Sequence, residues 1–452
     1  MAGFMASLSA TSDALRAFEK ALSVVQNNVA NAMTPGYARQ RLYLEALPFV
    51  PEAGFPGGVR AARIESARQD YAEQAVRARQ SVWARSDELA AALGRIEHLF
   101  DVSGQIAIPR AITALFEAFS AWSMAPNDTV ARQSVLERAR DLTSRFQETA
   151  SALAQAFHQT SAAIQNQVAQ INRLVGRVRE LNVLYRQDIR NLEDPSLDAR
   201  LHAVLEELSQ VADFTALRQE DGSVMILLGG QTPLLVGEEQ FEISADLSQP
   251  QARILDAAGR DITWQVTQGR LGAQLEFRNR ILPEVTADLN RLAAGLADAV
   301  NAALAAGLDR NGQPGAPLFA YDAPEIAAAT LRITAITPDE LAAASAAAPG
   351  GNGNALALAE LANSPALDGF TFIGFYGWIA RRVGGALQDA REAADQQKQM
   401  LLQTQWLREQ ASAVSLDEEA VNLVRFQRAY EAAARMIRAI DELMETVIRL
   451  VG

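Results

Sequence analysis

Two stretches near opposite ends of the chain place apolar side chains at every seventh residue. In residues 4–31, one row consists of Leu8, Leu15, Leu22 and Val29, and a second row of Thr11, Phe18 and Val25. Toward the other end, one row consists of Leu416, Leu423, Tyr430, Ile437, Met444 and Val451, and a second row of Phe426, Ala433, Ile440 and Val447. Two apolar positions in seven form a narrow stripe, which suits packing of helix against helix better than the face of a globular core. The pattern therefore predicts two terminal helices that pair as a coiled coil and use these rows as an assembly interface.

Length, charge and cysteine content limit the classes of protein. The chain has 452 residues, which is enough for about three domains, and a formal net charge of -13. Because no basic stripe is present to neutralise phosphates, nucleic acid is not expected as a partner. Cysteine is absent, which excludes disulfides, thiol nucleophiles and thiolate metal sites. We find no secretory signal and no run of ~20 apolar residues, so neither a cleaved leader nor insertion into a membrane is expected.

The order of patterns along the chain predicts a mainly α fold with a β insertion. Long helices, which predict a bundle, are expected over about 68–100, 108–124, 128–188, 196–211, 283–306 and 377–409. The Pro- and Gly-rich residues 48–58 are expected to form a loop, and short β-branched runs between Phe214 and Phe277 predict a small antiparallel β domain. The expected domains are a terminal coiled-coil domain (1–45 and 411–452), a long-helix bundle (46–212 and 283–410) and an inserted β domain (213–282).

Residues that might carry chemistry are few and have ordinary explanations. The three histidines, His98, His158 and His202, fall on predicted helices, and none has a partner at metal-ligand spacing, so packed or solvated rings are expected. The run 309–312 resembles half of a calcium loop but lacks the distal acid, which favours a plain Asn-Gly turn. The acidic run 417–419 follows Ser415 at a helix start, where carboxylates complement the helix dipole. The sequence therefore predicts no catalytic residue, no metal site and no cofactor.

Two motifs resemble a known family. The first lies at the end of the N-terminal stripe, in Asn27, Asn28, Asn31, Thr34, Gly36 and Tyr37; the second is the run from Ser415 to Ala432. Together they resemble the axial proteins of the bacterial flagellum, which include rod, hook and hook-associated proteins. The continuation 36–40, the segments 219–234 and 271–278, the turn 309–312 and the stretch 352–361 are more similar to the hook-associated proteins of the hook–filament junction than to the hook protein.

The resemblance implies a structural protein of the flagellum. Its subunits would self-assemble into a ring or short helical tube between hook and filament, with the terminal helices lining the inner tube. The implied partners are the hook protein, the third hook-associated protein and a flagellar export chaperone that holds the C-terminal helix. Members of the family leave the cell unfolded through the flagellar type III export channel, without a cleaved signal peptide, and work outside it. Longer relatives carry an extra outer domain, which we expect to be absent here because the interval between Phe319 and Asn352 is short.

Three other readings remain open at this point. The nearest is another flagellar axial protein of hook or rod type, which the central β segment distinguishes. A non-flagellar coiled-coil surface protein would need a secretion signal and usually sequence repeats. A hydrolase on this scaffold would need clustered His or acidic residues in the inserted domain, and residues 213–282 contain no histidine.

Overall fold

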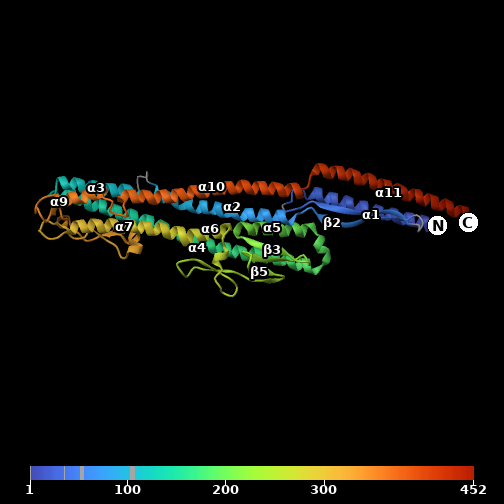
Figure 1. Cartoon of the computed structure of the whole chain (residues 1–452), viewed down its shortest axis with the longest axis horizontal. Helices are drawn as coiled ribbons and strands as arrows, with labels where there is room; N and C mark the ends of the chain where they lie inside the picture. The colour runs from blue at the N-terminus through green and yellow to red at the C-terminus, as the bar shows by residue number, and fades with distance from the viewer. Residues whose placement is uncertain (1, 35, 51–54, 102–106, 452) are drawn as a thin grey trace. The chain divides into compact units, whose positions relative to one another are not determined.

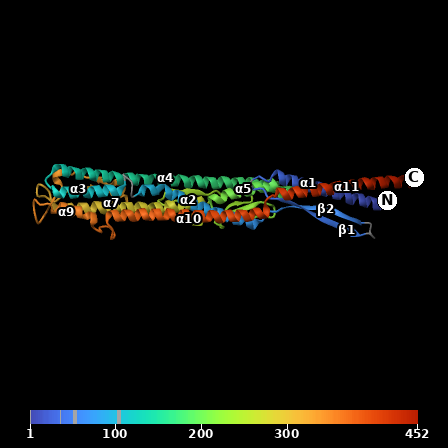
Figure 2. The ribbon, with the colours of Figure 1, turned by 90° about the horizontal axis from the view of Figure 1, so that it is seen from above.

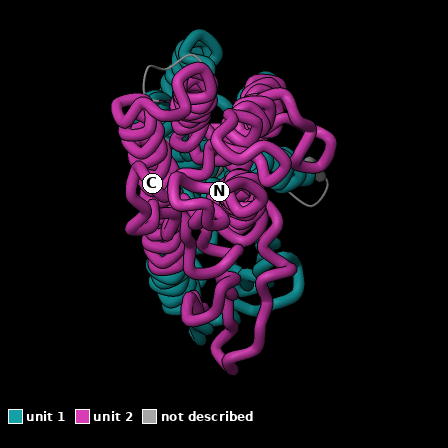
Figure 3. Tube along the Cα trace, turned by 90° about the vertical axis from the view of Figure 1, so that its left-hand side faces the viewer, with its two compact units in different colours: residues 1–82, 170–242, 397–452 teal, residues 83–169, 243–396 magenta. Residues whose placement is uncertain are grey.

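The structure is a computed structural model that describes residues 2–34, 36–50, 55–101 and 107–451. It is mainly helical with small antiparallel sheets, as the sequence predicts (Figures 1 and 2). The chain divides into two compact units (Figure 3). Unit 1 comprises residues 1–82, 170–242 and 397–452, and unit 2 comprises 83–169 and 243–396. The boundaries of these two units differ from those of the three expected domains. The three-domain division itself stays a prediction.

The long helices begin and end close to their predicted bounds. They are α2 (Asp70–Glu97), α3 (Ile108–Met124), α4 (Thr129–Gln187), α5 (Pro195–Val211), α7 (Leu282–Ala305) and α10 (Phe372–Ser412). Asp194 caps α5 by accepting a hydrogen bond from Ser196 N, and Pro195 occupies the first helical position, where its missing N–H costs nothing. Strong periodicity combined with such capping explains why these bounds can be predicted.

The two terminal helices, α1 (Ala2–Ala30) and α11 (Leu416–Val451), lie side by side in unit 1 (Figures 1 and 2). The two terminal helices therefore pack against one another, as the sequence predicts, whereas their pairing as a coiled coil stays a prediction. A hairpin of β1 (Gln40–Val50) and β2 (Phe55–Ser66) follows α1 and packs against it, mainly through β2. This hairpin and both terminal helices form one end of unit 1.

The hairpin corrects two expectations. The expected boundary between residues 45 and 46 falls inside β1, and the expected loop over 48–58 holds the end of β1 and the start of β2. The register pairs Gln40 with Ser66 and Phe49 with Pro56. Gly57 and Gly58 lie in β2 with φ of +71° and +135°, values that glycine adopts readily and other residues rarely do. Residues 51–54, part of the expected loop, lie outside the described residues.

A four-stranded antiparallel sheet completes unit 1. Its order is β3 (Phe214–Arg218), β4 (Val224–Leu228), β5 (Thr232–Val236) and β6 (Glu239–Gln240). Asn182, fully buried on α4, holds the sheet because its side chain donates to Val224 O at 2.9 Å and Gly237 O at 2.7 Å and accepts from Val224 N at 2.8 Å. One amide thus satisfies three backbone groups.

Unit 2 holds an extended apolar core. Fully buried side chains of α3, α7 and α10 meet there, among them Phe119, Leu292 and Tyr376. The smaller elements are β7 (Ser244–Asp246), β8 (Arg253–Leu255), α6 (Gly269–Glu276), β9 (Gly307–Leu308), β10 (Phe319–Ala320), α8 (Ala327–Thr330), β11 (Arg332–Ile333), β12 (Ala344–Ser345) and α9 (Gly353–Glu360). Among them, β7 pairs with β8, β9 with β12, and β10 with β11.

The expected end of the β domain at residue 282 is wrong. The chain is helical from Gly269, where α6 leads through a π-helical segment (Phe277–Ile281) directly into α7. Leu271 and Leu275 are buried on one face of α6, and Phe277 is fully buried in the core of unit 2. A helical spacing of apolar residues that is only two turns long is easily read as a short strand.

Candidate assembly element

The structure orients the C-terminal stripe toward the rest of the chain. Ala433 and Ile440 are buried, and the other predicted positions that are at least half-buried are Leu423, Phe426, Tyr430, Ile437, Met444 and Val447. Leu416, at the first turn of α11, is 55% exposed. The side chain of Val451 lies outside the described residues. This stripe forms the side of α11 that is covered within the chain.

On α1, the covered face is shifted from the predicted rows. Its buried residues are Thr11, Ala17, Ala21, Val24, Val25 and Asn28, whereas Leu8, Leu15, Phe18 and Leu22 are half-buried and Val29 is 46% exposed. Ala17 and Ala21, four residues apart, have small side chains. Together with Val24 they let the hairpin and α11 approach α1 closely. The i, i+4, i+7 spacing of Ala17, Ala21 and Val24 is the sequence signal that a seven-residue reading misses. Whether the predicted rows contact other subunits stays a prediction.

Asn28 is the centre of a hydrogen-bond network that joins the two family motifs. It is 1% exposed. Its side-chain oxygen accepts from Gln40 N and from Tyr37 Oη, both at 2.9 Å. Its side-chain nitrogen donates to Gln40 O at 2.9 Å and to Glu419 Oε2 at 3.2 Å. An Asn amide offers two donors and two acceptor sites, and here all are used.

Ion pairs reinforce this network. Arg39 binds Glu418, and its second guanidinium nitrogen lies 2.8 Å from Glu419 Oε1. Glu419 is 1% exposed. Its buried charge is compensated by the ion pair with Arg39 and by the hydrogen bond from Asn28. The acidic start of α11 therefore has a partner at the other end of the chain, beyond the helix-dipole role predicted for it. We call Asn28, Tyr37, Arg39, Gln40, Glu418 and Glu419 the signature network.

Burial shapes the chemistry of Tyr37. Burial, followed by the nearby charge of Glu419, raises the pKa of Tyr37 to about 12. The phenol is therefore neutral at physiological pH and can donate its proton to Asn28.

The remaining signature residues build the turn between α1 and the hairpin. Asn31 donates to Asn27 Oδ1 at 2.6 Å, and Thr34 donates to Asn31 Oδ1 at 3.2 Å. Gly36 has φ of +76°, and a Cβ there would lie 2.7 Å from Ala199 O. Only glycine satisfies both the left-handed backbone and this close approach to α5. The signature thus specifies one backbone path.

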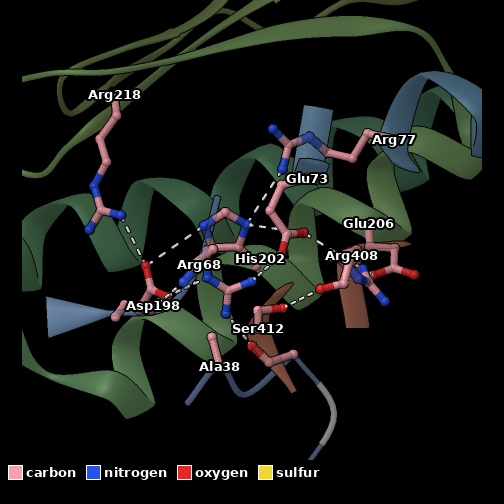
Figure 4. Close-up of polar contacts among 12 residues, drawn as sticks. Ala38, Arg68, Glu73, Arg77, Asp198, His202, Glu206, Arg218, Arg408 and Ser412 are labelled. Atoms are coloured by element: carbon pink, nitrogen blue, oxygen red, sulfur yellow. Dashed lines mark hydrogen bonds and ion pairs between the residues drawn. The ribbon is translucent and has the colours of Figure 1, made fainter. Parts of the chain in front are cut away.

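A second polar group holds this turn against the body of unit 1. Arg68, which follows β2, donates to Gly36 O and pairs with Glu73 of α2 at 2.6 Å and Asp198 of α5 at 2.7 Å. Arg218 of β3 also binds Asp198, at 2.9 Å. Figure 4 shows the His202 ring among these charges. We call the set Arg68, Glu73, Arg77, Asp198, His202, Glu206, Arg218 and Arg408 the His202 cluster.

The sequence does not predict the His202 cluster, because its members come from five separate segments. Arg408 of α10 lies 3.1 Å from Glu206 and 3.6 Å from Glu73, which ties α10 to α5 and α2. Of the two states left open for the histidines, packed or solvated, His202 adopts the packed one, since its side chain is 7% exposed. The one sequence hint is Asp198 and His202 at i, i+4 on a helix.

Comparisons with known proteins agree with these features. The family model of the flagellar hook-associated protein FlgK helical domain matches residues 93–319, just over half of the chain. The model of the flagellar basal body rod FlgEFG protein C-terminal region matches residues 408–450, which include the start of α11.

Individual relatives carry the same description. Flagellar hook-associated protein 1 of Bacillus subtilis is 25% identical, over 97% of this chain and 97% of that protein. The protein of the same name from Salmonella typhimurium is also 25% identical, over 69% of this chain but 59% of its own length. The solved flagellar hook junction protein FlgK from Burkholderia pseudomallei is similar in fold, with a TM-score of 0.66 at 16% identity, over 74% of this chain and 99% of that one. The chain belongs to the flagellar hook-associated protein FlgK family.

Proposed function

We propose that this chain is a structural subunit of the junction between the hook and the filament of the bacterial flagellum. The family is one of flagellar structural proteins, so a flagellar location and association with other axial components follow from membership. The observation that carries the proposal is the signature network, in which Asn28 and Glu419 join the motifs of both chain ends into one element. The rod-type match is confined to residues 408–450, which favours the junction role over a hook or rod role.

Assembly through the terminal helices is the proposed mechanism. Although α1 and α11 cover one another, α11 still exposes Val421, Val424, Met436, Leu443 and Ile448, each by 46–68%. Apolar side chains in such number on one helix favour further helix partners. Self-assembly into a ring or short helical tube would bury them, together with Leu416 and Val29. The hook protein on one side and the third hook-associated protein on the other are the proposed axial neighbours.

The route to that position is proposed to be flagellar type III export of the unfolded chain, without a cleaved signal peptide. The absence of cysteine suits passage through a narrow channel, since no disulfide must be broken or re-formed. Among residues 2–34, 36–50, 55–101 and 107–451, no helix is both long and apolar enough to cross a lipid bilayer. The exposed apolar side chains of α11 are the proposed target of an export chaperone before secretion. The chain would then work outside the cell.

We assign no catalytic activity, metal, cofactor or nucleic-acid partner to the chain. Asp309, the best sequence candidate for a metal ligand, accepts from the backbone N–H groups of Asn311 and Gln313 at 2.8 Å, which is the geometry of a turn. Elemental analysis of purified protein tests this assignment, and stoichiometric zinc or calcium would contradict it.

Substitutions in the terminal helices test the proposed role. Leu22→Asp and Tyr430→Asp place a carboxylate at half-buried positions, where an unpaired charge is heavily unfavourable. Arg428→Asp, at an exposed position of α11, the helix that carries Tyr430, is the matched control. We expect cells with either of the first two variants to carry hooks without filaments and to release filament subunits into the medium. Normal swimming by Leu22→Asp cells that secrete the variant would contradict assembly through these helices.

A further inference from the structure

His202 occupies a buried position between two groups of charges. Its ring belongs to α5 and is 7% exposed. Nδ1 lies 3.4 Å from a guanidinium nitrogen of Arg77 and 3.8 Å from Glu73 Oε2, both on α2. Nε2 faces Asp198 Oδ1 at 3.7 Å. Figure 4 shows the ring between Asp198 on one side and Glu73 with Arg77 on the other.

This geometry favours the neutral form of the ring. Arginine can only donate, so Nδ1 must be the accepting nitrogen, and the single ring proton lies on Nε2, toward Asp198. A second proton on Nδ1 would point at the N–H groups of Arg77. Protonation of Nδ1 therefore opposes the contact with Arg77, although Glu73 Oε2 also lies 3.8 Å from this nitrogen.

Charges of both signs surround the ring. Arg68, Arg77 and Arg218 act on the ring directly, opposed by Glu73 and Asp198. Arg408 of α10 and Glu206 of α5 lie next, Asp70 of α2 acts on Arg77 and Arg218, and Glu409 of α10 lines the same pocket as His202. A protonated imidazole adds a positive charge beside Arg68, Arg77 and Arg218, and protonation of Glu73 or Asp198 removes a charged partner of Arg68.

The signature turn depends on these charges through Arg68. The Arg68 side chain is 7% exposed and is oriented by Glu73 and Asp198 while it donates to Gly36 O. When its carboxylates lose their charge or the ring gains one, Arg68 loses the contacts that hold it against the turn. We propose that the His202 cluster is an acid-sensitive latch, which holds the turn between α1 and the hairpin at neutral pH and releases it as the cluster takes up protons.

The direction of the pH dependence follows from linkage. Burial, and then the charge of Arg68, lower the pKa of His202 to about 3, with Arg77 and Arg218 adding to this and Asp198 opposing it. Because the folded-state pKa lies below the ordinary value of 6.5, the contribution to stability is complete above pH 6.5 and is lost as pH falls toward 3. Burial opposes ionisation of Asp198, but the surrounding positive charges hold its pKa below the ordinary value, so it acts in the same direction.

Linkage also sets the size of the effect. If the ring regains its ordinary pKa on opening, the opening equilibrium constant is about 25-fold larger at pH 5 than at pH 7. The latch itself does not depend on the flagellar role. Its consequence for assembly, a junction that loosens in acid, rests on the proposed function.

Amide hydrogen exchange on the purified full chain tests the latch directly. After correction for intrinsic exchange rates, the protection of residues 31–40 should fall by about 25-fold or more between pH 7 and pH 5. His202→Gln keeps an acceptor for Arg77 but takes up no proton, so its loss of protection over the same range should be several-fold smaller. His158→Gln, at an exposed histidine of α4, is the control and should behave as the unmodified chain. Equal pH dependence in the unmodified chain and in His202→Gln, or none in the unmodified chain, would overturn the proposal.

A second measurement covers the case in which His202→Gln does not fold. The chain has three histidines, so the NMR signals of the imidazoles can be assigned with single variants. His202 should stay neutral down to at least pH 4.5 in the folded chain, and Arg77→Gln, which removes the cation facing Nδ1, should raise its titration midpoint. A His202 that titrates near pH 6.5 in the folded chain would contradict the latch.

Discussion

Replacement of Asn28 by alanine should detach the two chain ends from one another. Asn28→Ala removes hydrogen bonds to Gln40 N, Gln40 O, Tyr37 and the ionised Glu419. At about 1 kcal/mol for each neutral bond and about 1.5 kcal/mol for the charged one, the loss is about 4.5 kcal/mol. A half-open pocket of about 370 Å³ is lined by Gln40 and Glu419, and water that enters it would recover part of this loss. We therefore expect local opening to become easier by about 3 kcal/mol.

Hydrogen exchange is the suitable assay, because a long chain with two compact units need not unfold in one step. A change of about 3 kcal/mol corresponds to a fall of about 150-fold in the protection of residues 28–40 and 416–425. The core of α3 and α7 in unit 2 should keep its protection. Gln26→Ala, two residues away at an exposed position of α1, is the matched control and should change protection less than threefold. Equal effects of the two substitutions, or a change below threefold in Asn28→Ala, would refute the network as the link between the chain ends.

Three further outcomes follow from single contacts. Gly36→Ala forces an L side chain to φ of +76° with its Cβ 2.7 Å from Ala199 O. The free energy of local opening of the turn, measured by amide exchange, should therefore fall by about 2 kcal/mol. The folded-state pKa of Tyr37, about 12, lies above its ordinary value of 10, so its contribution to stability is complete below pH 10 and is lost as pH rises toward 12. Tyr37→Phe should reduce the alkaline loss of circular dichroism over that range. Arg132→Met should destabilise unit 2 by about 2–4 kcal/mol, measured by exchange in α3, because the buried guanidinium binds the carbonyl oxygens of Pro126, Pro338 and Leu341.

The sequence predicts those parts of the fold that depend on local order. The expected helix over 108–124 coincides with α3, and the expected helix over 128–188 differs from α4 by one residue at each end. Long apolar periodicity bounded by Pro, Asn and Asp is sufficient for this. The sequence does not predict β2 and α6, because β2 depends on pairing with β1, and α6 is stabilised by burial of Leu271 and Leu275.

In the candidate site, too, patterns along the chain can be predicted, whereas contacts between distant residues cannot. The signature residues can be found by resemblance, and the terminal stripes by spacing, since both are patterns along the chain. The partner of Asn28, 391 residues away at Glu419, cannot be read from either pattern. The His202 cluster is harder still, because each of its charges is ordinary alone and gains its meaning only where five segments meet.

The central claim is that this chain forms the hook–filament junction, and the absence of cysteine allows a direct test. Ala257→Cys places a single thiol at an exposed position. A maleimide dye applied to intact flagellated cells will label the protein at its location. Fluorescence or gold labelling should show one focus on each flagellum, where the hook meets the filament. Label distributed along the hook or the filament, or confined to the cell body of cells with complete flagella, would contradict the account.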